Sequence, residues 1–219
     1  MKTNKTELVF ILDRSGSMSG LESDTIGGYN ALLNQQRKEE GTAIITTVLF
    51  DDKVELLHDR LDINGVSDMT ARDYFVRGST SLLDAIGKTI SKIGNVQKNT
   101  KAEMRADKVL FVITTDGMEN SSVEYSYDRV KMMIERQKEQ YGWEFIFLGA
   151  NIDALATAQR FGIDASRAAN YHSDAVGTHL NYSTLNKTVS KFRNEAKIDD
   201  DWKADIEKDF TDRGKKKNH

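Results

Sequence analysis

Short apolar runs separated by polar stretches are the first pattern visible in this chain. Residues 8–12, 109–114 and 145–148 are rich in β-branched or aromatic residues and almost free of polar positions. Such runs are typical of strands in a parallel sheet that is covered on both faces. Residues 43–50 form a fourth run, followed by Asp51-Asp52 and then by residues 53–58. We predict a hairpin here, with both aspartates in its turn, so one edge strand should be antiparallel.

Between these runs, apolar residues recur with the three- and four-residue spacing of helices. The pattern predicts helices over residues 21–40, 81–96, 124–140, 152–161, 179–197 and 199–212. Residues 170–179 are polar and predicted to be irregular. Because strands and helices alternate, we predict an α/β doubly wound (Rossmann-like) fold with a mostly parallel sheet of six strands.

The chain length and these patterns suggest three parts. We predict a main α/β domain over residues 1–175, a helical C-terminal extension over residues 176–212 and a flexible basic tail over residues 213–219.

Composition narrows the possible functions. The net charge of −3 gives no electrostatic basis for binding nucleic acid, and the absence of cysteine excludes disulfides and thiolate sites. The N-terminal apolar run is about six residues long, shorter than a signal peptide needs. No apolar segment approaches the roughly 18 residues of a membrane span. We therefore expect a cytoplasmic protein that binds neither membrane nor nucleic acid.

Polar side chains follow the predicted strands at the points where these strands end. Asp13, Ser15 and Ser17 alternate directly after residues 8–12. Asp116 follows residues 109–114, and Thr80 precedes the helix predicted from residue 81. Ligands of doubly wound sheets bind beyond the carboxyl ends of the strands. An oxygen-only set without His or Cys suits a hard cation, Mg²⁺ or Mn²⁺.

The same residues resemble the metal-ion-dependent adhesion site (MIDAS) of von Willebrand factor A (vWA) domains. The D-x-S-x-S segment at residues 13–17, Thr80 in GST and Asp116 in TTDG occur in the order of that family. The resemblance covers roughly residues 6–165 and is greatest to small stand-alone bacterial and phage members. It implies that Ser15, Ser17 and Thr80 contact the ion directly, whereas Asp13 and Asp116 hold it largely through waters.

Other polar residues near the strand ends have structural interpretations. Ser15 and Ser17, taken alone, could simply cap the following helix. The segments SLLD at residues 81–84 and SSVE at residues 121–124 match capping boxes, and we expect both to be structural. Candidates for the border of a groove formed by the C-terminal region are Tyr171, His172 and Tyr182.

The leading functional hypothesis is a metal-dependent protein-binding module rather than an enzyme. The resemblance implies that the bound cation accepts an Asp or Glu side chain from a partner protein, and we expect the chain alone to be a monomer. One alternative is a Mg²⁺-dependent phosphate-ester enzyme, which we disfavour because no general base stands out. A second alternative is a regulatory scaffold without metal-dependent binding. We assign no catalytic residue.

Overall fold

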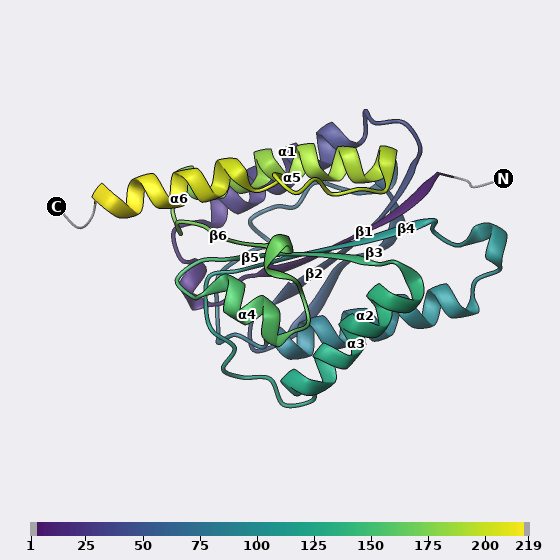
Figure 1. The fold of residues 1–219 in the computed structure, drawn as a ribbon, viewed down its shortest axis with the longest axis horizontal. Coiled ribbons are helices and arrows are strands. Elements are labelled where there is room, and N and C mark those ends of the chain that lie inside the picture. Colours follow the sequence, from purple (N-terminus) through teal and green to yellow (C-terminus); the bar gives the residue numbers. More distant parts are fainter. Residues whose placement is uncertain (1–3, 217–219) are drawn as a thin grey trace.

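The structure is a computed structural model that describes residues 4–216. A six-stranded sheet lies at its centre, with the strand order β3-β2-β1-β4-β5-β6 (Figure 1). The strands are β1 (Lys5–Asp13), β2 (Thr42–Phe50), β3 (Val54–Asp62), β4 (Lys108–Thr115), β5 (Glu144–Gly149) and β6 (Ala168–Asn170). Edge strand β3 is antiparallel to β2, and all other neighbours are parallel. The predicted doubly wound α/β fold is confirmed, including its antiparallel edge strand.

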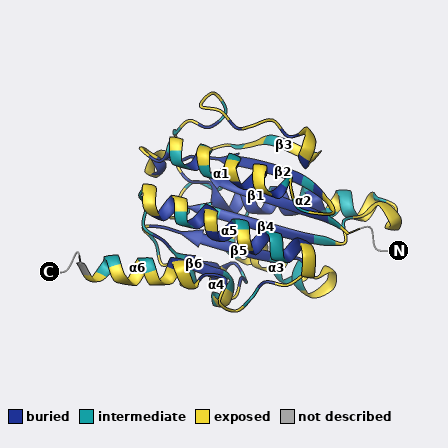
Figure 2. Ribbon diagram, turned by 90° about the horizontal axis from the view of Figure 1, so that it is seen from above, coloured by how far each residue is buried: buried dark blue, intermediate teal, exposed yellow. Residues whose placement is uncertain are grey.

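Helices cover both faces of the sheet, as the views in Figures 1 and 2 show. The helices are α1 (Glu22–Gln36), α2 (Leu82–Asn99), α3 (Tyr127–Tyr141), α4 (Ala154–Arg160), α5 (Ala175–Glu195) and α6 (Ala204–Lys216). Helices α1, α5 and α6 lie on one face, and α2, α3 and α4 lie on the other (Figure 1). Among the described residues, no helix is long and apolar enough to cross a membrane.

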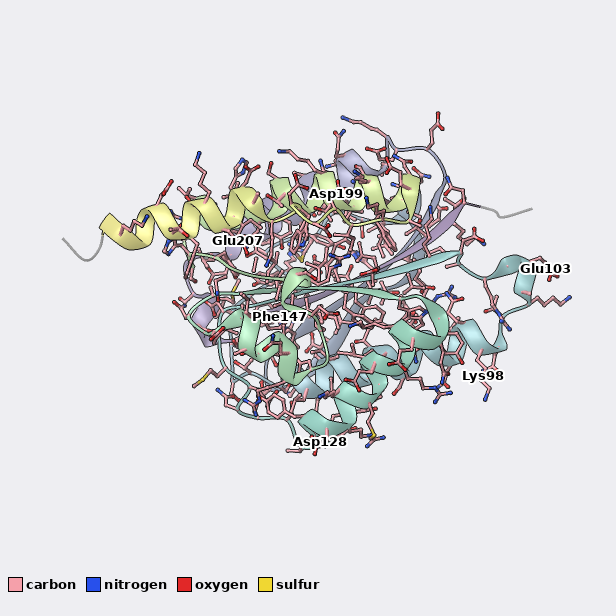
Figure 3. All side chains as sticks on the ribbon, viewed as in Figure 1. Lys98, Glu103, Asp128, Phe147, Asp199 and Glu207 are labelled. Atoms are coloured by element: carbon pink, nitrogen blue, oxygen red, sulfur yellow. The ribbon has the colours of Figure 1, made fainter. Side chains whose placement is uncertain are left out.

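Alternation along β1 divides the buried side chains between these two layers. Leu8, Phe10 and Leu12 pack toward α1 and α5, whereas Val9 and Ile11 pack toward α2 and α3. This two-sided burial explains why β1 reads as a continuous apolar run. Strand β5 is buried on both faces in the same way, and its Phe147 lies in the interior (Figure 3). The charged residues labelled in Figure 3 lie at the periphery.

The C-terminal half departs from the predicted elements in several places. β6 was not foreseen, because it has only three residues and lacks an apolar run. The prediction that residues 170–179 are irregular is wrong in part, since α5 begins at Ala175 behind the N-cap Asp174. α6 continues through Lys216, into the predicted tail, whereas residues 217–219 lie outside the described residues.

Helix α5 covers the sheet directly, although we assigned it to a C-terminal extension. Its Tyr182, Leu185, Val189 and Phe192 belong to the same buried cluster as Leu8 of β1. The C-terminal residues therefore supply part of the helical layer that covers one face of the sheet.

Candidate metal centre

Asp13 is the last residue of β1, and its side chain is almost completely buried. Its Oδ1 accepts a hydrogen bond from the backbone N–H of Ser15 at 2.7 Å, and its Oδ2 accepts one from Thr115 Oγ1 at 2.6 Å. The parallel pairing of β1 with β4 brings Thr115 and the following Asp116 to this edge of the sheet. The two carboxylates that we predicted as metal-holding groups therefore share one strand edge.

Three hydroxyl groups meet beside these carboxylates. The Oγ atoms of Ser15 and Ser17 lie 3.1 Å apart, and Thr80 Oγ1 donates to Ser15 Oγ at 3.1 Å. These contacts are hydrogen bonds in the structure. The same spacing suits Mg²⁺, because octahedral ligands at about 2.1 Å from the ion place neighbouring oxygens about 3.0 Å apart.

Asp116 has one satisfied and one unsatisfied oxygen. Its Oδ2 accepts a hydrogen bond from Ser173 Oγ at 2.7 Å. Its Oδ1 is buried and has no hydrogen-bond partner in the described part of the chain. A buried carboxylate oxygen without a partner is costly, and such groups call for an unseen ion or water. This atom fits a cation site whose ligand sphere the protein does not complete by itself.

Gly117 leaves space next to the hydroxyl groups. A Cβ atom at this position would lie 3.1 Å from Ser17 Oγ and 3.3 Å from Thr80 Oγ1. Any other side chain at position 117 would therefore come too close to two of the predicted ligand oxygens. The glycine of the TTDG motif thus has a local steric role at the site.

Backbone hydrogen bonds hold the contributing loops against one another. Gly16 N–H donates to the carbonyl of Gly78 at 3.1 Å. Thr80 N–H donates to Asn120 Oδ1 at 2.9 Å, and Asn120 N–H donates back to the carbonyl of Thr80 at 3.1 Å. The loops after β1, before α2 and after β4 therefore position one another, and the structure brings all five predicted residues into one linked group.

The charges at this site favour a cation. Burial raises the pKa of Asp13, the hydrogen bonds from Ser15 and Thr115 oppose this effect, and the negative charge of Asp116 adds to it. The net result is a pKa above the ordinary value for this carboxyl group. A positive ion between the two carboxylates would offset the cost of burying the Asp13 charge, which is the main cause of the raised pKa, and the smaller repulsion from Asp116.

The donor set indicates the kind of cation. Across residues 4–216, no three Asp, Glu, His or Cys side chains converge into a group that could hold a metal. The site instead combines two carboxylates with three hydroxyls, which are ligands for hard cations such as Mg²⁺, Mn²⁺ or Ca²⁺.

A buried ion cluster adjoins the site, and sequence reasoning missed it. Asp51 is fully buried, and its Oδ2 accepts hydrogen bonds from Arg14 Nε at 2.7 Å and Arg77 Nε at 2.8 Å. Burial would raise the pKa of Asp51, but hydrogen bonds from Arg77, Lys53 and Arg14 outweigh it and lower the pKa. Asp51 is a turn residue, as predicted, and it also anchors the loop that precedes Thr80.

Neither predicted capping box forms its side-chain bonds. Ser81 is the N-cap residue of α2, as predicted, but its Oγ donates to the carbonyl of Asp51 at 2.6 Å and not to the helix start. Asp84 accepts hydrogen bonds from three consecutive backbone N–H groups, those of residues 123–125. Helix α3 begins at Tyr127 behind the N-cap Ser126, beyond the second predicted box. These side chains bind distant backbone, so local spacing could not reveal their partners.

The predicted groove border at the C-terminal region is wrong for two of its three residues. Tyr171 and Tyr182 are buried in the core, whereas His172 is partly exposed and stacks on Phe210. The residue that we missed in this region is Ser173, whose Oγ donates a hydrogen bond to the predicted site residue Asp116. No sequence motif marks Ser173, whereas Thr115 is adjacent to Asp116 in the TTDG motif and was within reach of sequence reasoning.

Comparisons with known proteins depend on structure alone, because no family model and no curated protein matches the sequence. A vWA domain protein from Catenulispora acidiphila superposes with a TM-score of 0.56 at 12% identity, covering 85% of this chain and 42% of that one. The chain has the fold of a von Willebrand factor A domain.

Two other solved structures with this fold contain a bound metal ion. Proximal thread matrix protein 1 from the mussel byssus, with a zinc-occupied MIDAS motif, has a TM-score of 0.57 at 12% identity. The match covers 84% of this chain, which spans less than half, 46%, of the mussel chain. Manganese-loaded TRAP protein from Plasmodium vivax has a TM-score of 0.55 at 15% identity, with coverage of 82% and 73%.

Proposed function

We propose that this vWA-fold chain is a metal-dependent protein-binding module of the cytoplasm, of bacterial or phage type. A divalent cation, Mg²⁺ or Mn²⁺, would be held at the carboxyl edge of the sheet and would accept an Asp or Glu side chain of a partner protein. The observation that carries the proposal is the buried and unpartnered Oδ1 of Asp116 beside three clustered hydroxyls. The metal-containing structures with the same fold support it.

The five residues would bind the cation in two different ways. Ser15, Ser17 and Thr80 would supply neutral oxygens directly, and Asp13 and Asp116 would hold the remaining positions largely through waters. With neutral donors in contact, the bound cation would keep a strong attraction for a carboxylate from outside. Ser17 is exposed, so the site opens to solvent on the side where a partner would approach.

Enzymatic activity is not part of this proposal. Within residues 4–216, the hydrogen bonds around the three hydroxyls come from hydroxyl, carboxylate and backbone groups and the Asn120 amide, with no His or Lys side chain among them. Asp13 is engaged with Ser15 and Thr115, and Asp116 Oδ2 is engaged with Ser173. The unpartnered Oδ1 of Asp116 is assigned in this proposal to the cation and not to a general base.

The test combines metal binding with partner capture. Isothermal titration with Mg²⁺ and Mn²⁺ would compare the wild type with Ser17→Ala and Asp13→Ala. The matched control is Ser19→Ala, because Ser19 is an exposed serine two residues away whose hydroxyl has no partner among the described residues. Capture from a lysate of the source organism would then use the same proteins, with Mg²⁺ or with EDTA.

We expect the wild type and Ser19→Ala to bind the cation and retain the same partner in Mg²⁺ only. Ser17→Ala and Asp13→Ala should lose both properties while keeping the circular dichroism of the folded wild type. Capture of identical proteins in EDTA and by Asp13→Ala would show that the metal centre is not the binding surface.

A further inference from the structure

The loop between β6 and α5, residues 171–174, reaches the metal centre from a part of the chain outside the predicted site. Its Ser173 donates the single described hydrogen bond to Asp116, at Oδ2. This bond fixes the orientation of the carboxylate and leaves Oδ1 as its unsatisfied oxygen. Hydrogen bonds of this kind orient metal-holding carboxylates and strengthen metal binding.

The residues on both sides of Ser173 are attached to helix α6. The ring of His172 stacks on Phe210, with 4.8 Å between ring centroids, and its Nε2 donates to the Phe210 carbonyl oxygen at 3.1 Å. Asp174 accepts a hydrogen bond from Arg213 at 2.6 Å. Three consecutive loop residues therefore connect Asp116 on one side to α6 on the other.

Helix α6 is anchored at its beginning, and its far half makes these loop contacts. Ile206 is buried in the core, and just before the helix Lys203 Nζ donates to the carbonyl of Ala168 in β6 at 2.8 Å. Figure 1 shows α6 continuing past the carboxyl edge of the sheet, where the metal centre lies. Phe210 is partly exposed, at 37%. The contacts with His172 and Asp174 are thus made by the outer, less buried part of the helix.

We infer that Ser173 is a positioning residue of the metal centre, and that α6 holds it against Asp116 through Phe210 and Arg213. Cation binding and docking of the outer half of α6 are then coupled. Displacement of this half releases residues 172–174 and removes the hydrogen bond that orients Asp116. The coupling is reciprocal by thermodynamic necessity, so the bound cation also stabilises the docked helix. This inference rests on the proposed cation site.

A purely structural role for the same contacts predicts something different. Asp174 is the N-cap of α5 and accepts the Gly177 N–H at 2.9 Å, so loss of the loop contacts could simply weaken this helix start. The stability of the chain would then fall, but cation affinity would not change. Metal affinity and helix protection, rather than stability, therefore decide between the two roles.

The first experiment measures Mg²⁺ affinity by isothermal titration on the full chain. Ser173→Ala should bind about 10-fold more weakly than wild type. Ser173→Thr keeps the hydroxyl and should restore most of the affinity. The control is Ser166→Ala, because Ser166 is exposed and its hydroxyl has no partner among the described residues. Equal affinity of Ser173→Ala and wild type would overturn the inference.

The second comparison addresses helix α6. Arg213→Ala removes the bond to Asp174 and should weaken Mg²⁺ binding about 5-fold. Lys208→Ala removes the same charge from an exposed position of α6 that has no ion pair in the described part of the chain, and should bind as wild type does. Arg213→Ala with wild-type affinity would show that α6 is not coupled to the site.

Hydrogen exchange distinguishes the two roles, because a purely structural role of Ser173 predicts no Mg²⁺-dependent change in the exchange rates of α6. Amides of residues 207–213 should exchange more slowly in Mg²⁺ than in EDTA in the wild type, and this difference should disappear in Ser173→Ala. A wild type that binds no divalent cation would overturn both this inference and the proposed function. A wild type that binds Mg²⁺ and captures no partner would contradict the proposed function alone.

Discussion

Gly117→Ala gives a direct test of where the cation is held. The added Cβ would lie 3.1 Å from Ser17 Oγ and 3.3 Å from Thr80 Oγ1, so these two oxygens would have to move by a few tenths of an ångström. The backbone of Gly117 is outside the left-handed region, so alanine fits it without strain. Mg²⁺ requires near-ideal octahedral geometry, and small ligand displacements therefore reduce its affinity.

The magnitude follows from linkage between binding and folding. At a Mg²⁺ concentration of 100 times Kd, the wild type should gain about 2.7 kcal/mol of unfolding free energy. A loss of affinity of about 10-fold leaves the variant with about 1.4 kcal/mol at the same concentration. For a chain of this size, 1 kcal/mol corresponds to about 2–4 °C. The Mg²⁺-dependent rise in Tm should therefore be about half the wild-type value.

Scanning calorimetry in Mg²⁺ and in EDTA measures this rise. In EDTA, the unfolding free energy of Gly117→Ala should stay within about 1 kcal/mol of wild type, because a tolerated alanine also restricts the unfolded chain. The matched control is Gly27→Ala on α1, where an added Cβ meets no atom within 4 Å. Its Mg²⁺-dependent rise should equal that of the wild type. A full wild-type rise in Gly117→Ala would refute the placement of the cation beside Ser17 and Thr80.

Three further predictions concern the surroundings of the site. Asp51→Asn removes the negative charge that is paired with the buried Arg14. The free energy of unfolding, measured with urea at neutral pH, should fall by about 3 kcal/mol. Because folding lowers the pKa of Asp51, its charge stabilises the protein above the ordinary carboxyl range. This contribution should be lost as the pH falls from about 5 to about 2, and the difference between wild type and Asp51→Asn should shrink there. Gly28→Ala would place a Cβ 2.2 Å from the ring of Tyr182 and should destabilise the α1–α5 packing by about 1–3 kcal/mol, measured by thermal unfolding against Gly27→Ala.

The order of strands and helices could be predicted from hydrophobic patterning because burial on both faces leaves a local signature. β1, β4 and β5 are continuous apolar runs, and polar residues of the site lie at the ends of β1 and β4. The elements that escaped prediction are those with weak patterns. β6 has three small or polar residues, and its place in the sheet depends on pairing with β5.

The candidate ligand residues of the site could be predicted from the sequence, but the residues that hydrogen-bond to them could not. Asp13, Ser15 and Ser17 are close in sequence, but taken alone the two serines could have capped a helix. Thr80, Asp116 and the resemblance to the MIDAS motif are what suggested that these residues converge. The two capping boxes failed because Asp84 binds the backbone of residues 123–125 across a sequence separation of about 40 residues.

The sequence by itself determined the alternating elements, the two-sided core and the oxygen-rich strand ends, because each depends on neighbouring residues along the chain. Only the tertiary structure decided that Arg14 and Arg77 share Asp51, and that Ser173, 57 residues from Asp116, donates a hydrogen bond to its carboxylate. Contacts of this kind arise when strand pairing and helix packing bring separate loops to one edge of the sheet. The residues that form such contacts have no fixed spacing in the sequence, so no local sequence pattern predicts which residues pair.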